Sequence, residues 1–216
     1  MKEFCIFGLG NFGATVARKL AEAGQRVSAV DSDKNKVQAM QEFVHLAIFG
    51  DATDRKFLEN LEVKNYDCCV VSTGEDSHAS ILIALYLKEL EAKRIVVKAN
   101  SEDHARILKK VGADETVIPE QEMAVKVARN LAQPNVLDYL PLTEEYSIAE
   151  VVPPHQFVGK SLMDLQLRSN YKTEVIAIKD TATNKFKFIP NAAYKLKETD
   201  VLVVLGKEES IESMRG

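Results

Sequence analysis

One short run near the amino terminus, FCIFGLGNFG at residues 4–13, constrains the fold more than any other part of the chain. An apolar strand at residues 4–7 runs directly into Gly8, Gly10 and Gly13, and apolar positions then recur at helical spacing through residues 14–23. A strand, a glycine-rich turn and a helix in this order are typical of the first unit of a doubly wound parallel sheet. The sequence therefore predicts an α/β, Rossmann-like fold built around this turn.

The glycines of such a turn have separate physical roles. Gly8 allows the tight turn, Gly10 lets a phosphate approach bare backbone, and Gly13 lets the helix pack closely on the sheet. The free amides at the start of the helix, together with its dipole, attract an anion. We expect an adenine nucleotide or dinucleotide here, with a purely structural turn as the alternative. Asn11 and Phe12, between the glycines, belong to the predicted site.

Polar residues at the following strand ends extend the predicted site. Asp31 follows a strand at residues 26–30, where a carboxylate can accept from both ribose hydroxyls and would repel a 2′-phosphate; helix capping is its alternative role. Asp51 follows a third strand and could accept from the adenine amino group, with helix capping by Thr53 or Asp54 as the alternative interpretation of this segment. The remaining predicted nucleotide-binding positions are Ser32, Ala52, Thr53, Ser72, Thr73, Gly74 and Lys98.

Two domains are expected. Six strands alternate with helices over residues 1–132, which matches one doubly wound domain. Pro134 breaks the helical pattern, so residues 133–142 are expected to form a crossover linker with a short helix and turn at 136–140. Residues 143–216 are expected to form a small α+β domain, which buries little surface alone and should pack against a copy of itself or the first domain. Its expected strands are 147–152, 174–179, 185–189 and 201–205, with helices at 162–167 and from 208.

Composition narrows the possible partners and locations. The 28 basic and 32 acidic residues give a net charge of −4, so no broad basic surface and no nucleic-acid partner are expected. The first strand begins within four residues, and no apolar stretch approaches the roughly 20 residues of a membrane span, which predicts a cytoplasmic protein without a signal peptide. Cys5, Cys68 and Cys69 lie in predicted buried strands, as small core residues in a reducing compartment do.

Several further runs give the chain a close resemblance, over nearly all of its length, to the cytoplasmic gating subunits of bacterial Trk/Ktr-type potassium uptake systems. These subunits are RCK proteins, or regulators of potassium conductance. The second domain resembles their TrkA-C type. Besides the glycine run, the resemblance rests on Ala29-Val30-Asp31, Gly50-Asp51-Ala52-Thr53, Val97-Lys98-Ala99-Asn100, Lys110-Val111-Gly112-Ala113-Asp114, Pro119-Glu120 and Asn135-Val136-Leu137-Asp138-Tyr139.

The resemblance implies a regulatory subunit, not an enzyme. It implies a homodimer in which residues 120–140 cross to the neighbour, and an octameric ring under an integral-membrane potassium transporter at the inner face of the plasma membrane. ATP or ADP in some members, and NAD or NADH in others, would change the ring's shape and gate the pore. Lys98 would border the phosphates, and Glu120 would help to hold Mg²⁺ or Ca²⁺ near those of ATP. Asn11 stands where close Ktr relatives carry an arginine that contacts phosphate, so this chain lacks that cation.

The resemblance also implies a second ligand, because several relatives bind cyclic di-AMP in the second domain. The positions that would line such a site are Leu167, Arg168, Ile176, Ile178 and Pro190. They offer an apolar floor for the bases and a cation for phosphate. Glu174 stands where relatives carry an asparagine, which places an unfavourable charge beside an anion.

Two other functions compete with a gating subunit. An NAD-dependent oxidoreductase would need a proton donor or base facing the nicotinamide and a substrate pocket. His45, His78, His104 and His155 show no recognisable catalytic spacing, and no substrate domain is evident. A stand-alone cytosolic nucleotide sensor would use the same site without a transporter.

Overall fold

The computed structural model describes residues 1–74, 76–132, 136–143 and 145–214. The chain divides into two compact units, Met1–Met123 and Ala124–Gly216. Residues 133–135 of the predicted linker, including Asn135 of one resembling run, lie outside the described residues. The predicted domain limits at 132 and 143 stay a prediction.

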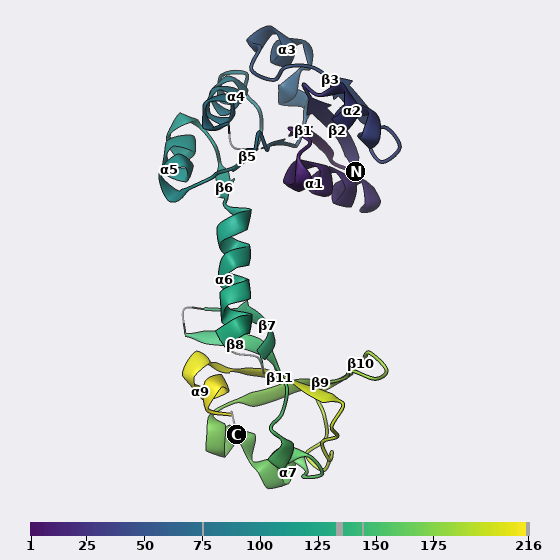
Figure 1. Ribbon diagram of the computed structural model, residues 1–216, viewed down its shortest axis with the longest axis vertical. Helices are drawn as coiled ribbons and strands as arrows, with labels where there is room; N and C mark the ends of the chain where they lie inside the picture. The colour runs from purple at the N-terminus through teal and green to yellow at the C-terminus, as the bar shows by residue number, and fades with distance from the viewer. Residues whose placement is uncertain (75, 133–135, 144, 215–216) are drawn as a thin grey trace. The chain divides into compact units, whose positions relative to one another are not determined.

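The first unit is a six-stranded parallel sheet in the order β3-β2-β1-β4-β5-β6, with helices between successive strands (Figure 1). This order reverses direction between β1 and β4, which is the switch point of a doubly wound sheet, and confirms the predicted Rossmann-like fold. The strands are β1 (Glu3–Phe7), β2 (Arg26–Asp31), β3 (Leu46–Phe49), β4 (Cys68–Val71), β5 (Ile95–Lys98) and β6 (Glu115–Val117). The helices are α1 (Asn11–Glu22), α2 (Lys34–Met40), α3 (Arg55–Asn60), α4 (Ser77–Glu89) and α5 (Glu102–Val111), and a 3₁₀ helix, η1, spans Val63–Asn65. Helix α6 (Pro119–Ala132) includes the boundary between the two units.

The central strands are buried on both faces, as strands of a parallel sheet covered by helices must be. Phe7 of β1 packs into one core cluster and Ile6 into the other, because successive side chains point to opposite faces. Cys5 and Cys69 lie opposite each other on β1 and β4. Burial raises the pKa of the Cys69 thiol to about 12 and that of Cys5 well above its usual range, so both stay protonated. The prediction that the cysteines are core residues is confirmed.

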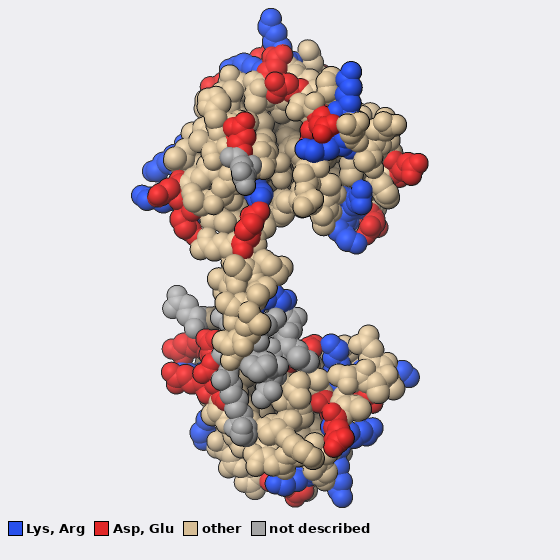
Figure 2. Space-filling view, viewed as in Figure 1, with Lys and Arg blue, Asp and Glu red and all other residues tan. Residues whose placement is uncertain are grey.

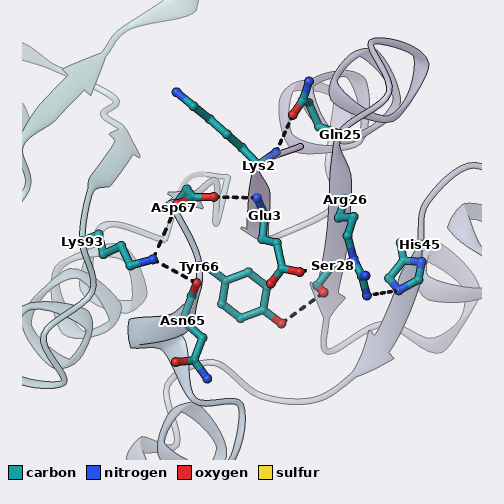
Figure 3. Close-up of polar contacts among 10 residues, drawn as sticks. All are labelled: Lys2, Glu3, Gln25, Arg26, Ser28, His45, Asn65, Tyr66, Asp67 and Lys93. Carbon is teal, nitrogen blue, oxygen red and sulfur yellow. Dashed lines mark hydrogen bonds and ion pairs between the residues drawn. The ribbon is translucent and has the colours of Figure 1, made fainter.

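Polar contacts hold together the amino ends of β1, β2 and the segment before β4, as Figure 3 shows. The Glu3 backbone N–H donates to Asp67 Oδ2 at 2.8 Å and lowers the pKa of that carboxyl. Arg26 Nε lies 3.3 Å from Glu3 Oε1, and the Tyr66 hydroxyl lies 3.1 Å from Ser28 Oγ. These contacts lie toward the amino ends of the strands, away from the carboxyl end of β1, where the glycine turn begins.

The second unit is built on a five-stranded antiparallel sheet in the order β10-β9-β11-β8-β7 (Figure 1). One buried cluster, which includes Leu165, Ile178, Leu202 and Ile211, forms its core. The α+β class predicted for this region is confirmed. Its elements are β7 (Val136–Pro141), β8 (Tyr146–Val151), the 3₁₀ helix η2 (His155–Phe157), α7 (Leu162–Leu165), α8 (Leu167–Tyr171), β9 (Glu174–Asp180), β10 (Lys185–Phe188), β11 (Asp200–Lys207) and α9 (Glu208–Ser213).

Two local predictions in this region were wrong. Residues 136–140, expected as a short helix and turn, belong to strand β7, which pairs antiparallel with β8. The hydrogen-bond partners that make β7 a strand come from β8, so the local pattern around the prolines did not reveal them. The expected helix at 162–167 is two helices, because Gln166 adopts a left-handed conformation with φ of +45° and separates α7 from α8.

Charged side chains of both signs are interspersed over each unit on the face that Figure 2 shows. In the part of the chain that the structure describes, no helix combines the length and apolar character that crossing a bilayer requires.

Candidate functional site

The glycine turn has the geometry that its three roles require. Gly8 has a φ of +93°, and a Cβ there would lie 2.0 Å from the Ser72 carbonyl oxygen, so only glycine fits. A Cβ on Gly13 would lie 2.0 Å from the Gly8 carbonyl oxygen. Gly10 differs from both, because no heavy atom lies within 4 Å of the Cβ position and its φ of −67° suits any residue. Open space therefore borders Gly10 at the start of α1.

A cavity of about 430 Å³ lies at the carboxyl ends of the strands on both sides of the switch point. It brings together residues from four loops that are far apart in the sequence. The predicted site residues that line it are Gly8, Gly10, Asp31, Ser32, Asp51, Ala52, Thr53, Ser72, Thr73 and Gly74.

Five predicted residues do not line this cavity: Asn11, Phe12, Gly13, Lys98 and Glu120. Phe12 packs against a core cluster, and Asn11 is exposed in the first turn of α1. Lys98 and Glu120 pair with each other, with Nζ 2.5 Å from Oε1, and this contact lowers the pKa of the Glu120 carboxyl. The Lys98 side chain is largely buried and that of Glu120 exposed.

Asp31 is a buried carboxylate that holds the glycine turn in place. Its Oδ2 accepts from the Leu9 N–H at 2.6 Å, and its Oδ1 accepts from the Asp33 N–H at 2.8 Å. The helix that follows is capped by Asp33, which accepts from the Asn35 N–H at 2.9 Å. Asp31 is therefore not the cap of α2, and its carboxylate lies in the wall of the cavity.

A second carboxylate in the wall, Asp51, organises its own loop. Its Oδ1 accepts from the Thr53 backbone N–H at 2.9 Å and from the Thr53 hydroxyl at 2.7 Å. The cap of α3 is Asp54, which accepts from the Lys56 N–H at 2.9 Å. Of the two capping residues considered, Thr53 and Asp54, it is therefore Asp54 that caps the helix. Asp51 and Asp31 both present acceptors, which suit the hydroxyl and amino groups of a nucleoside.

Sequence reasoning missed two charged residues of the cavity wall. Lys36 belongs to the first turn of α2, and Asp76 caps α4 by accepting from the Ala79 N–H at 2.9 Å. Both residues follow the carboxyl end of a strand within a few positions. This position in the sequence is the signal that could have indicated them, because the carboxyl ends of the strands border the cavity. With them, the described wall holds three carboxylates and one ammonium group.

The second unit has a cavity of its own, also of about 430 Å³, beside α7, α8 and β9. Of the residues predicted for a second ligand, Leu167, Arg168 and Pro190 line it. Ile176 and Ile178 do not, and Ile178 is part of the core. The Arg168 guanidinium is held by Glu174, whose Oε2 lies 2.6 Å from Nε and 2.5 Å from a terminal nitrogen.

Fold and cavities together define a two-domain protein: a doubly wound domain with a ligand-sized cavity at its switch point, and a small antiparallel α+β domain. Residues 4–119 match the TrkA-N domain and residues 147–215 the TrkA-C domain. The chain is 40% identical to the Ktr system potassium uptake protein C of Bacillus subtilis, over 97% of this chain and 94% of that protein. It is 36% identical to protein A of the Ktr system of the same organism, over 98% and 94%. The chain belongs to the TrkA/Ktr family of potassium uptake proteins.

Solved structures show the same fold. The RCK domain of GsuK matches with a TM-score of 0.68 at 20% identity, over 99% of this chain and 46% of that one. The GsuK channel bound to NAD matches with a TM-score of 0.57 at 22% identity, over 99% and 38%. This chain thus spans less than half of each of these two solved chains.

Proposed function

We propose that this protein is a non-enzymatic regulatory subunit that senses an adenine nucleotide and gates a membrane potassium transporter of the Trk/Ktr type. The observation that carries the proposal is the switch-point cavity, in which open space at Gly10 faces a buried carboxylate at Asp31. The ligand is ATP or ADP, or NAD(H). Phosphate would lie against Gly10 and ribose against Asp31, and Asp51 would approach adenine. Family membership supports the transporter as partner.

Gating requires only that the nucleotide bind one conformation of the assembly better than another, and about 1 to 3 kcal/mol is the usual scale of such coupling. Because Asp31 accepts a hydrogen bond from the Leu9 N–H, a ligand that contacts Asp31 would also affect the position of the glycine turn and of α1. In this proposal the subunits form homodimers that assemble into an octameric ring at the cytoplasmic face of the transporter.

A divalent cation, Mg²⁺ or Ca²⁺, is proposed to accompany ATP with Glu120 as a protein ligand. A carboxylate oxygen is a suitable donor, and Mg²⁺ often takes one or two carboxylates together with phosphate oxygens and water. Among the described residues, no group of three or more His, Cys, Asp or Glu side chains could hold a metal ion, so phosphate oxygens and water would supply most of the ligands. Glu120 would also have to leave Lys98. The fit is therefore partial, and the gating proposal does not depend on the cation.

Cyclic di-AMP is the proposed ligand of the second unit's cavity. Leu167 and Pro190 offer apolar surface, and Arg168 offers the cation for phosphate. Because Glu174 holds Arg168, binding an anion there requires that this ion pair open. Ile178 could take part only if the core rearranged, so the apolar contacts would come from the other lining residues.

Binding measurements on the purified full chain test the proposal directly. Thermal-shift and calorimetric titrations with ATP, ADP, NADH, NADPH and cyclic di-AMP, each with and without Mg²⁺ or Ca²⁺, should show affinity for an unmodified adenine nucleotide. Copurification from membrane extract should recover an integral potassium transporter. Turnover of NADH with hydroxy acids or aldehydes would favour the oxidoreductase, and nucleotide binding without a membrane partner would favour a stand-alone sensor.

A further inference from the structure

Lys36 gives the nucleotide cavity a cation in an unexpected place. Among the described lining residues it is the only basic one, and it lies beside Asp31, with Nζ 3.8 Å from Oδ2. Phosphate is expected at the glycine turn, whereas Lys36 pairs with Asp31, where ribose is expected. Lys36 therefore lies where the ribose of a nucleotide is expected and not where its phosphates are expected.

Asp31 can satisfy the donor function of a ribose hydroxyl but not its acceptor function. Each oxygen of this carboxylate already accepts one backbone N–H, from Leu9 and from Asp33, and each keeps capacity for another bond. An ionised carboxylate can only accept, whereas a hydroxyl donates one hydrogen bond and also accepts. Asp31 can thus take the proton of a ribose hydroxyl but cannot donate to its oxygen.

Lys36 has the missing donors. At 3.8 Å its contact with Asp31 is an ion pair and not a hydrogen bond, and the ammonium makes no hydrogen bond to the described part of the chain. Its side chain is 47% exposed, while that of Asp31 is 9% exposed, so the ammonium can adjust and the carboxylate cannot. The helix that carries Lys36 is anchored by its buried neighbour Val37.

We propose that Lys36 is a specificity-determining residue that recognises ribose together with Asp31. A ribose hydroxyl of the bound nucleotide donates to the Asp31 carboxylate and accepts from the Lys36 ammonium. The pair therefore selects ribonucleotides over deoxyribonucleotides. This inference rests on the proposed function, because it concerns the same cavity.

Two other roles for Lys36 give different signatures. A lysine that only attracts the negative nucleotide through its charge would affect ribose and deoxyribose forms equally. A lysine that binds a 2′-phosphate would affect NADPH and leave ATP and NADH unchanged. Only a hydrogen bond to the hydroxyl changes the ratio between ribose and deoxyribose ligands.

Lys36→Met tests the proposal, because it removes the ammonium and keeps a long apolar stem. Lys34→Met is the matched control: Lys34 is exposed on the same helix, lies over the Phe49 ring at 5.0 Å and does not line the cavity. Calorimetry on the full chain would give the affinities of ATP, 2′-deoxy-ATP and 3′-deoxy-ATP for the unmodified protein and both variants. If NADH binds in place of ATP, the deoxyadenosine analogues of NAD serve the same comparison. Thermal unfolding would confirm that both variants are folded.

The unmodified protein and Lys34→Met should prefer ATP to at least one deoxy analogue by about tenfold or more, the scale of a hydrogen bond to a charged group. In Lys36→Met this preference should fall by about threefold or more, mainly through weaker ATP binding, and the remainder would come from the bond to Asp31. An unchanged preference in Lys36→Met, an equal loss for all three ligands, or no preference in the unmodified protein would overturn the inference and leave the proposed function standing. If the unmodified protein binds no adenine nucleotide at all, both fail.

Discussion

At the scale of single residues, the glycine turn separates positions that serve the fold from positions that serve a ligand. A Cβ at Gly8 or Gly13 would enter the backbone of a neighbouring segment, whereas a Cβ at Gly10 would meet no protein atom. The size of the side chain at position 10 is therefore restricted by a bound ligand and not by the protein itself. This contrast makes the turn a good place to test binding without disturbing the fold.

Gly10→Val is expected to fold normally and to lose nucleotide affinity by about tenfold or more, since the branched side chain would hold phosphate away from the amides of α1. Gly8→Ala is the contrasting variant. It should lower the free energy of unfolding by about 2 kcal/mol or more, because of the positive φ and the close Ser72 carbonyl. Chemical unfolding and calorimetry would measure both effects. Retained nucleotide affinity in Gly10→Val would contradict close approach of phosphate to this backbone.

Asp31 should affect both stability and binding, because it holds the Leu9 N–H and faces the cavity. Asp31→Ala leaves that buried N–H without a partner, which costs about 1–3 kcal/mol of folding free energy. Asp31→Asn keeps an acceptor for Leu9 and should be less destabilising. Both variants should weaken ATP, ADP and NADH binding together. Chemical unfolding would measure the effect on stability, and calorimetric titration would measure the effect on nucleotide affinity. Unchanged affinities in Asp31→Asn would show that the carboxylate does not recognise the ligand.

The sequence predicts those cavity residues that the backbone places in the cavity by their position at the end of a strand. Gly8, Asp31 and Asp51 follow strand ends, and parallel strands bring their carboxyl ends to one edge. Lys98 also ends a strand, but its side chain turns to Glu120, a choice set by a partner 22 residues away. Lys36 lies in the first turn of α2 and not at a strand end, and the sequence pattern does not show which exposed side chains of that helix reach the cavity.

At the scale of elements, strands and helices with a strong local pattern were found, and those defined by a distant partner were not. The alternation of strands and helices in the first unit carries its own signal, as buried strands and amphipathic helices do. Strand β7 depends on its pairing with β8, and the break between α7 and α8 depends on the left-handed Gln166. Neither feature has a strong local signature.

Helices α4 and α5 are linked by a buried histidine, His104 of α5, which contacts Ser80 of α4. The Asn100 N–H donates to His104 Nδ1 at 3.2 Å, so the neutral ring carries its proton on Nε2 and donates to Ser80 Oγ at 3.0 Å. The Ser80 hydroxyl in turn donates to the Ser77 carbonyl at 2.9 Å. Burial lowers the pKa of His104, because the charged ring loses solvation. Protonation of Nδ1 would also remove the acceptor for the Asn100 N–H.

His104 should therefore make the protein less stable in mild acid. Its folded-state pKa lies below the unfolded value of about 6.5, so the unfolded chain binds the proton first as the pH falls. The stabilisation from the neutral ring is complete above that pH and is lost toward the folded-state pKa, with a slope of at most about 1.4 kcal/mol per pH unit. Thermal unfolding between pH 7.5 and pH 5 should show this slope, and His104→Gln should reduce it. An identical slope in the variant would assign the effect to other groups.

At the scale of the whole molecule, α6 is the element that bears on assembly. Its residues include the boundary between the two units, and it displays several large apolar side chains to solvent. Met123, Val125, Val127 and Leu131 are each about half exposed or more. At helical spacing Met123, Val127 and Leu131 share one face of α6, and an exposed apolar stripe of this kind commonly marks a surface that another chain covers. The resemblance to gating subunits predicts a dimer contact in the same segment, at residues 120–140.

Val127→Lys should therefore weaken self-association, because it places a charge among the apolar side chains of α6 that would be buried in a dimer. Gln121→Lys adds the same charge to an exposed polar position of the same helix and is the control. Light scattering coupled to size-exclusion chromatography, at matched protein concentrations, should show a smaller species for Val127→Lys alone. Because gating requires that subunits move relative to one another, the dissociated variant should still bind nucleotide at the intact cavity but lose any nucleotide-dependent change in particle size. An unchanged mass for Val127→Lys would place the subunit contact elsewhere on the chain and separate the cavity from the assembly it is proposed to control.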